Sequence, residues 1–301
     1  MKIPIVFLGT GQAIPTAKRN HTAILLTYKS ENILIDCGEG TQRQFRKLKL
    51  NPCNLTKLLI THWHGDHILG IPGLLQTLAL NGYNKTLEIY GPRGTLRFMN
   101  EILNMFIFQD KLKYKIKEVE SGKIFENSDF YIEAEKMIHG APCLAYSFVE
   151  KEKIRINKEK LNKLKIKGKI IAELAKEKDI IWQGKKIIAS KLTYKQPERK
   201  ITFIFDTEIN PNCYKIAKNS DLLICESTFL ENSENGKDLA KRYHHLTASQ
   251  AGQIAKKSCS KKLILTHLSQ RYENKEKFIL AEAKKIFKNT EIAEDLTKVE
   301  V

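Results

Sequence analysis

The sequence has no long hydrophobic run, no paired cysteines and no repeat at a solenoid period. No apolar stretch approaches the roughly 18 residues that cross a bilayer, and the apolar start at residues 3–8 is too short for a secretory signal. The 6 cysteines form no C-x-x-C pair, and a chain of 301 residues can bury a core without disulfides. We therefore expect a soluble, cytoplasmic protein with reduced thiols and no membrane partner.

Acidic residues are scarce, because 34 Asp and Glu face 51 Lys and Arg, a net charge of +17. Such an excess favours polyanionic partners such as nucleic acid or an acidic membrane surface. Residues 151–200 alone hold 17 Lys and Arg against 6 Asp and Glu, an excess of 11. A lysine-rich coding bias would have spread the charge evenly along the chain. Most of the excess positive charge therefore belongs to this segment.

The same segment, 151–200, shows some helical periodicity and contains one aromatic tryptophan, Trp182. We interpret it as a small protruding basic arm without a hydrophobic core of its own, inserted into a single domain that spans residues 1–301. A solvated surface insertion without a binding role is the alternative.

Histidine is also uncommon, with 8 in the chain, yet three of them lie in one short stretch with an aspartate. His62, His64, Asp66 and His67 follow the apolar run 58–60, which predicts a buried strand with the polar residues on a loop at its end. Imidazole nitrogen and carboxylate oxygen suit a divalent ion such as zinc, and four such groups exceed what one open tetrahedral site takes from one loop. The stretch indicates two metal ions, and the alternative is a polar helix start with solvated histidines.

Further polar residues follow other predicted strands. The predicted strands 131–138, 201–205, 222–225 and 262–265 are followed by His139, Asp206, Glu226 and His267, respectively. The sequence also predicts a basic helix that ends near Leu50, a helix at residues 71–80 and a helix that runs through Phe106. Alternation of strands and helices with polar tips indicates an α/β sandwich, with the site along one edge of two facing sheets. The pattern alone equally allows a doubly wound sheet.

The spacing H-x-H-x-D-H at residues 62–67 resembles the signature of the metallo-β-lactamase superfamily of dinuclear zinc hydrolases. Nearly the whole chain is similar to the ribonuclease Z family, endonucleases that process the 3′ ends of tRNA. The matching stretches are residues 7–11, 36–42, 70–75, 91–94, 138–140, 206–207, 226–229 and 264–272. The resemblance fades in the basic arm, where the family's Gly-Pro pattern is represented only by residues 165–169. It implies an αβ/βα sandwich.

This resemblance also implies a set of site residues. One zinc ion takes His62, His64 and His139. The second takes Asp66, His67 and His267, and Asp206 bridges both. Asp66 is then the proton acceptor, and His245, in a stretch that matches the family's His-Ser-Thr motif without its serine, donates a proton to the leaving 3′-oxygen. Glu226 orients His245, with the neighbouring His244 as a competitor for the donor's role.

The activity implied by the resemblance is a zinc-dependent endoribonuclease. It removes the 3′ trailer from tRNA precursors and leaves a 3′-hydroxyl on the tRNA and a 5′-phosphate on the trailer. A homodimer is implied too, in which the basic arm of one subunit clamps the tRNA that the other cuts. The expected RNA-binding residues are Lys163, Lys165, Lys167 and Lys169 of the arm and Arg19. Arg19 lies in the loop of residues 15–20, which resembles the family's Pro-x-Lys-x-Arg-Asn pattern but has its lysine one place later. In the family this loop is implicated in the choice of cleavage position. The treatment of CCA-containing precursors is therefore left open.

Two other functions compete with this one. A metallo-β-lactamase-fold hydrolase of another phosphodiester, a small ester or a lactam would keep the ligands but has no need of the basic arm. An RNA-binding protein with an inactive metal site would lack at least one ligand, and none of the seven expected ligands is missing.

Overall fold

The computed structural model describes residues 2–105, 107, 112–168 and 170–301. The chain divides into two compact units. The first, called the sandwich unit below, comprises residues 1–125, 132–148 and 200–301. The second, called the basic unit, comprises residues 126–131 and 149–199.

Two seven-stranded sheets are present in the part of the chain that the structure describes. The first has the order β18 (Lys298–Glu300), β1 (Pro4–Gly9), β2 (Ala23–Tyr28), β3 (Glu31–Ile35), β4 (Lys57–Leu59), β5 (Thr86–Gly91) and β6 (Lys113–Glu118). The second has the order β17 (Thr290–Ile292), β16 (Leu263–Thr266), β15 (Leu222–Glu226), β14 (Arg199–Ile204), β9 (Cys143–Glu150), β8 (Phe130–Met137) and β7 (Gly122–Glu126). Strands β3 to β6 pair in parallel, as do β14 to β17. The carboxyl ends of these parallel strands therefore meet at one edge of each sheet.

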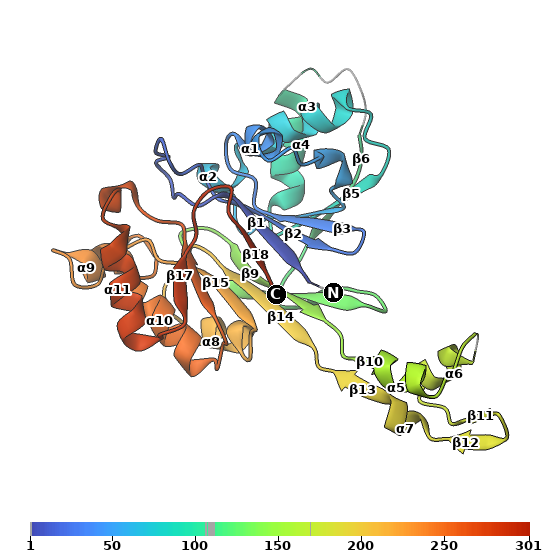
Figure 1. Ribbon diagram of the computed structural model, residues 1–301. Coiled ribbons are helices and arrows are strands. Elements are labelled where there is room, and N and C mark those ends of the chain that lie inside the picture. The colour runs from blue at the N-terminus through green and yellow to red at the C-terminus, as the bar shows by residue number, and fades with distance from the viewer. Residues whose placement is uncertain (1, 106, 108–111, 169) are drawn as a thin grey trace. The chain divides into compact units, whose positions relative to one another are not determined.

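Helices cover the outer face of each sheet (Figure 1). The first sheet carries α1 (Thr41–Lys47), α3 (Ile71–Leu80) and α4 (Thr95–Met105), which bury Phe45, Leu74 and Met99 against it. The second carries α8 (Pro211–Ala217), α10 (Ala248–Lys257) and α11 (Glu276–Ile286), which bury Ile216, Ile254 and Ile279. Because neighbouring side chains of a strand point to opposite faces, every second residue of the same strands points to the inner face of its sheet.

The inner faces of the two sheets pack against each other. The rings of Tyr28 on β2 and Phe148 on β9 lie 5.2 Å apart between centroids, and the Tyr146 hydroxyl donates to the carbonyl of Ile60 at 2.7 Å. The order of layers is helices, sheet, sheet, helices. This confirms the predicted αβ/βα sandwich and excludes a doubly wound single sheet.

Most predicted elements are present with small shifts at their ends. The helix predicted at residues 71–80 is α3, and the basic helix predicted to end near Leu50 ends at Lys47. The helix predicted to run through Phe106 is α4, which ends at Met105, while Phe106 lies outside the described residues. Strand β7 was not predicted. The remaining elements of the sandwich unit are α2 (Gly65–Ile68), α9 (Gly236–Arg242), η1 (Pro52–Asn54) and η2 (Gln270–Tyr272).

The basic unit is built from short elements. Strand β10 (Lys153–Ile156) pairs with β13 (Thr193–Gln196), and β11 (Ile180–Trp182) pairs with β12 (Lys185–Ile187). Three helices complete it, α5 (Lys158–Lys163), α6 (Ile171–Ala175) and α7 (Ala189–Leu192).

The expectation that this segment lacks a core is wrong. Six of its residues form a buried apolar cluster, namely Leu161, Ile166, Leu174, Ile180, Ala189 and Leu192. Helices α5 and α6 and strand β11 contribute one each, α7 contributes two, and Ile166 lies between helices, so no single helical or strand period runs through the segment. The cluster therefore becomes visible only after folding.

No helix in the described part of the chain is long and apolar enough to cross a membrane.

Candidate metal centre

The histidine-rich stretch follows β4 at the carboxyl edge of the first sheet. The prediction placed the whole stretch on a loop, but Gly65–Ile68 forms the one-turn helix α2, so Asp66 and His67 are helical. Such a short helix has no room for an apolar period, which explains the error. His62 and His64 precede the helix, and His64 is its N-terminal flanking residue.

Seven side chains from both sheets come together in two groups. In each group one nitrogen or oxygen atom per residue lies within 4.8 Å of the others. The first group consists of His62, His64, His139 and Asp206, and the second of Asp66, His67, Asp206 and His267. Asp206 is shared, so the structure brings together the residues that the sequence singled out, in the grouping that the resemblance implies.

Ring nitrogens face one another across these groups. His64 Nδ1 lies 3.0 Å from His139 Nε2, and His67 Nε2 lies 3.2 Å from His267 Nε2. An Asp66 oxygen lies 3.3 Å from both His67 Nε2 and His267 Nε2. Two imidazole nitrogens at such a distance need a shared proton or a cation between them.

Contacts on the outer side orient these rings. His139 Nδ1 lies 3.0 Å from the carbonyl of His244, and His67 Nδ1 lies 2.7 Å from Asp36 Oδ2. A carbonyl only accepts, so His139 Nδ1 carries the proton, and its Nε2 offers a lone pair when the ring is neutral. The carboxylate of Asp36 does the same for His67. The Nε2 atoms of His139 and His67 are thus oriented to act as metal ligands.

Two buried polar atoms at the centre of these groups lack a hydrogen-bond partner in the described structure, His62 Nε2 and Asp206 Oδ1. Buried polar atoms are nearly always paired because an unpaired one loses its hydration without compensation. A divalent cation bound here would supply the missing partner for both atoms. The nitrogen and oxygen donor set is also the chemistry of zinc and related ions.

Electrostatics at the cluster are dominated by its carboxylates. Burial alone lowers the pKa of His67, but Asp206, Asp66 and Asp36 outweigh it and hold that pKa well above its usual range. Burial alone raises the pKa of Asp66, yet His67 and His267 bring it well below the usual range. Asp66 is therefore ionised and draws positive charge, whether a proton or a metal, into the site.

Beside the second group lies a histidine–carboxylate pair. His245 Nδ1 is 3.1 Å from Glu226 Oε2, and Glu226 also accepts from Thr207 N at 2.8 Å and Thr228 Oγ1 at 2.6 Å. Burial lowers the pKa of His245, but Glu226 and Asp206 raise it to about 9. The His245 ring centroid is 5.5 Å from that of His267. A protonated imidazole is thus held next to the candidate metal ligands.

The competing histidine has a different environment. His244 pairs with Glu208 through its ring, whose centroid lies 6.5 Å from that of His139, and its backbone carbonyl accepts from His139. The side chain of His244 is 43% exposed, whereas that of His245 is 12% exposed.

Two supporting residues were missed by the sequence analysis. Asp36 accepts from Thr61 N at 2.7 Å and Thr61 Oγ1 at 2.8 Å besides contacting His67, and Thr228 Oγ1 lies 3.0 Å from His267 Nδ1. Asp36 has φ = 54°, a left-handed conformation that is uncommon outside glycine and often marks functional sites. A signal existed for Asp36, because it follows an apolar strand as Asp206 does.

The expected RNA-binding residues differ in their exposure to solvent. Lys163, Lys165 and Lys167 are exposed on the basic unit, and Lys169 lies outside the described residues. Arg19 is buried, and its Nη1 donates to Thr10 Oγ1 and the carbonyl of Ala293, each at 2.7 Å. The guanidinium of Arg19 thus serves internal acceptors, and its contact with RNA stays a prediction.

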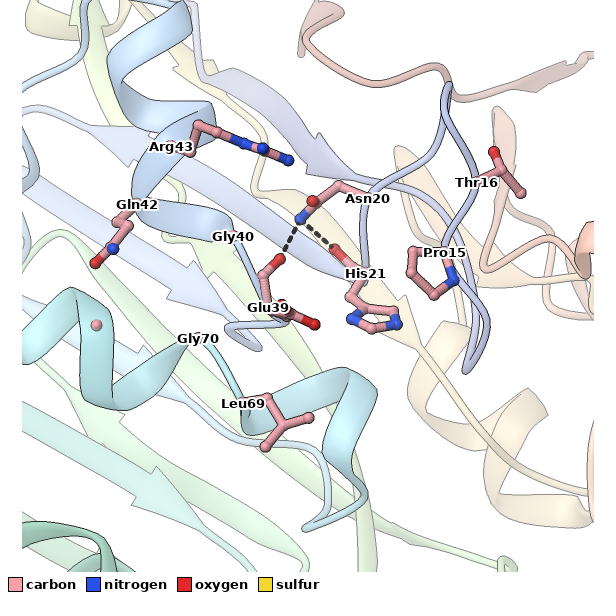
Figure 2. Close-up of a pocket in the computed structure, with 11 residues that line it drawn as sticks. Pro15, Thr16, Asn20, His21, Glu39, Gly40, Gln42, Arg43, Leu69 and Gly70 are labelled. Atoms are coloured by element: carbon pink, nitrogen blue, oxygen red, sulfur yellow. Dashed lines mark hydrogen bonds between the residues drawn. The ribbon is translucent and has the colours of Figure 1, made fainter. Parts of the chain in front are cut away.

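A cavity of about 500 Å³ adjoins the short helix α2 (Figure 2). The loop residues Pro15, Thr16 and Asn20 line one side of it, and Leu69 and Gly70, which directly follow α2, line another. Figure 2 shows the Asn20 side chain donating to the backbone carbonyl of Glu39, at 2.6 Å. The loop that departs from the family pattern is thus anchored next to the helix that carries Asp66 and His67.

Several known proteins are similar to this chain. Residues 3–191 match a family model described as anti-Pycsar protein Apyc1. The ribonuclease Z of Listeria welshimeri is 40% identical over 307 residues, which cover 99% of each protein. That of Methanothermobacter thermautotrophicus is 38% identical over 300 residues, which cover 99% of this chain and 96% of the relative.

Among solved structures, human tRNase Z, short form, is 27% identical, with a TM-score of 0.71 over 98% of each chain. The metallo-beta-lactamase fold protein YhfI from Bacillus subtilis is 19% identical, with a TM-score of 0.70 over 100% of this chain and 99% of that one. The second likeness supports the fold alone.

Proposed function

Because the chain belongs to the ribonuclease Z family of metallo-β-lactamase-fold proteins, it is a metal-dependent endoribonuclease of tRNA 3′ processing, and we propose how its residues divide that work. It removes the 3′ trailer from tRNA precursors, leaving a 3′-hydroxyl on the tRNA and a 5′-phosphate on the trailer. One observation carries the proposal. The two candidate ligand groups have Asp206 in common, and the hydrogen-bonded pair of His245 and Glu226 lies beside them.

We propose that both groups hold zinc. His62, His64 and His139 would hold one ion, Asp66, His67 and His267 would hold the other, and Asp206 belongs to both groups. When bound, the ions supply Lewis acidity and lower the pKa of coordinated water. Elemental analysis of metal-replete protein should find close to two zinc ions per chain, and a consistent value of one or none contradicts the assignment.

The chain's own residues handle the protons. Asp66, ionised at neutral pH because its pKa is depressed, accepts the proton of the attacking water. His245 donates a proton to the leaving 3′-oxygen, and Glu226 holds its ring in position through Nδ1 so that Nε2 carries the mobile proton. The negative charge of Asp66 suits a proton acceptor, and the positive charge of His245 suits a proton donor.

The basic unit is proposed to be an inserted RNA-binding arm of a single domain. Its exposed lysines, Lys163, Lys165 and Lys167, pair with no carboxylate among the described residues and so are available to phosphates. We further propose a cytoplasmic homodimer in which the basic unit of one subunit holds the tRNA that the other cuts.

Mixed dimers test the exchange between subunits. One partner carries Asp66→Ala, and the other carries alanine at the three lysines. If the basic unit acts on its partner's substrate, the mixture should recover cleavage that neither variant shows alone. No recovery from a mixture that demonstrably forms heterodimers means that each subunit uses its own basic unit.

Incubation of the protein with a 3′-extended tRNA precursor, followed by mapping of both product ends, tests the reaction. The expected products are a tRNA with a 3′-hydroxyl and a trailer with a 5′-phosphate, with no product after metal removal by a chelator. A second candidate is a hydrolase of another phosphodiester, which the same two candidate ligand groups would allow. Rapid turnover of a small phosphodiester with an intact precursor would favour that candidate.

A further inference from the structure

A cavity of about 820 Å³ lies wholly within the basic unit, and the proposed chemistry makes no use of it. The antiparallel pair β10 and β13 contributes Arg155 and Tyr194, helix α5 contributes Lys158 and Leu161, and helix α6 contributes Ile171 and Ala175. We call this cavity the Tyr194 groove. Its floor belongs to the apolar cluster of the unit, because Leu161 is buried there and Ile171 packs against it.

An unpartnered aromatic ring stands at the side of the Tyr194 groove. Tyr194 is 55% exposed, and no aromatic ring or cation contacts its ring in the described structure. It is the direct partner of Arg155 in the strand pair, so the two side chains share one face of the ribbon. A planar ring and a guanidinium on the same face form a surface on which a flat π-system can stack.

The charge of the groove is positive and not neutralised. Arg155 Nε donates to the neutral side chain of Gln196 at 2.8 Å, and Lys158 is exposed. No carboxylate pairs with either cation among the described residues, although Glu159 also lines the groove. The surrounding segment has an excess of 11 positive charges. A neutral apolar peptide leaves this charge uncompensated, whereas a phosphodiester backbone complements it.

We propose that the Tyr194 groove binds an unpaired nucleobase of the RNA, stacked on Tyr194, with an adjacent phosphate at Arg155 and Lys158. The inference rests on the proposed function and adds to it a preference for single-stranded or looped parts of the substrate. In a regular duplex the base faces are covered by their neighbours, so only an unpaired base can enter. The groove therefore recognises where bases are exposed, while the lysines respond to phosphates of any RNA.

Binding of two RNAs by four proteins tests the proposal. The RNAs are a 3′-extended tRNA precursor and a blunt RNA duplex of the same length. The proteins are the wild type, Tyr194→Ala, Tyr194→Phe and the control Ile181→Ala, which removes another exposed apolar side chain of the basic unit, 73% exposed and outside the groove. Affinity is measured as a function of salt concentration, and circular dichroism confirms that each variant is folded.

Tyr194→Ala should weaken precursor binding roughly 5- to 100-fold with an unchanged salt slope, because stacking releases no counterions. Tyr194→Phe and Ile181→Ala should bind as the wild type does, and duplex binding should not depend on Tyr194. Equal weakening for precursor and duplex, or no weakening for Tyr194→Ala, overturns the proposal. Either result leaves the proposed function standing, since precursor cleavage by the wild type tests that separately.

Discussion

Replacement of Asp36 by asparagine perturbs the metal centre without removing a proposed ligand. The buried carboxylate has two oxygens with different duties. Oδ1 accepts from Thr61 N at 2.7 Å, while Oδ2 accepts from Thr61 Oγ1 at 2.8 Å and lies 2.7 Å from His67 Nδ1. Asparagine keeps the shape of this group but has only one oxygen.

Either orientation of the asparagine is unfavourable. If its oxygen faces His67, its amide donor meets the Thr61 N–H, and a buried donor loses its partner at a cost of about 1–3 kcal/mol. If its amide faces His67, the ring must turn Nδ1 into an acceptor, and the proton moves to Nε2, which faces Asp66 and His267. That proton occupies the lone pair which a metal needs.

We therefore expect Asp36→Asn to lower metal affinity about 10- to 100-fold, as removal of a histidine's outer partner generally does. Competition with a chelator measures the affinity, and nitrogen-15 NMR of the histidines reports the tautomer of His67. The matched control is Asp295→Asn, since Asp295 accepts from Thr10 Oγ1 and Asn20 N and not from a candidate ligand. Unchanged metal affinity in a folded Asp36→Asn protein would refute the reasoning, as would an equal loss in the control.

Three other variants or conditions give independent checks. His245→Ala should lower the cleavage rate about 10²- to 10⁴-fold with both metals retained, and His244→Ala much less; reversed effects identify His244 as the donor. Because the pKa of His245 rises from 6.5 to about 9 on folding, its contribution to the stability of metal-free protein is complete below pH 6.5 and lost as the pH rises through 9. The melting temperature of chelator-treated protein should fall across that range, and less steeply for His245→Gln. Alanine at Lys163, Lys165 and Lys167 should reduce the slope of log affinity against log salt by about 0.7–0.9 for each phosphate that is no longer neutralised, and an unchanged slope shows that these lysines face solvent.

The residues that meet at the candidate metal centre could be named from the sequence by itself. Ligand chemistry is a property of residue type, and the position of a residue after an apolar strand is a local pattern of a few neighbours. His62 to His67 could therefore be found within one stretch, and His139, Asp206 and His267 from the ends of three further strands. The concentration of charge in residues 151–200 is likewise countable without a structure.

Tertiary structure decided what depends on contacts between distant segments. His67 and His267 lie 200 positions apart, yet their ring nitrogens are 3.2 Å apart, and no local pattern encodes that distance. Only the fold shows that the ring of His245 reaches Glu226, whereas the ring of His244 pairs with Glu208. The burial of Arg19 depends on the carbonyl of Ala293, 274 positions away. The apolar cluster of the basic unit also appeared only in the fold, because a core assembled from several short elements is defined by packing and not by periodicity.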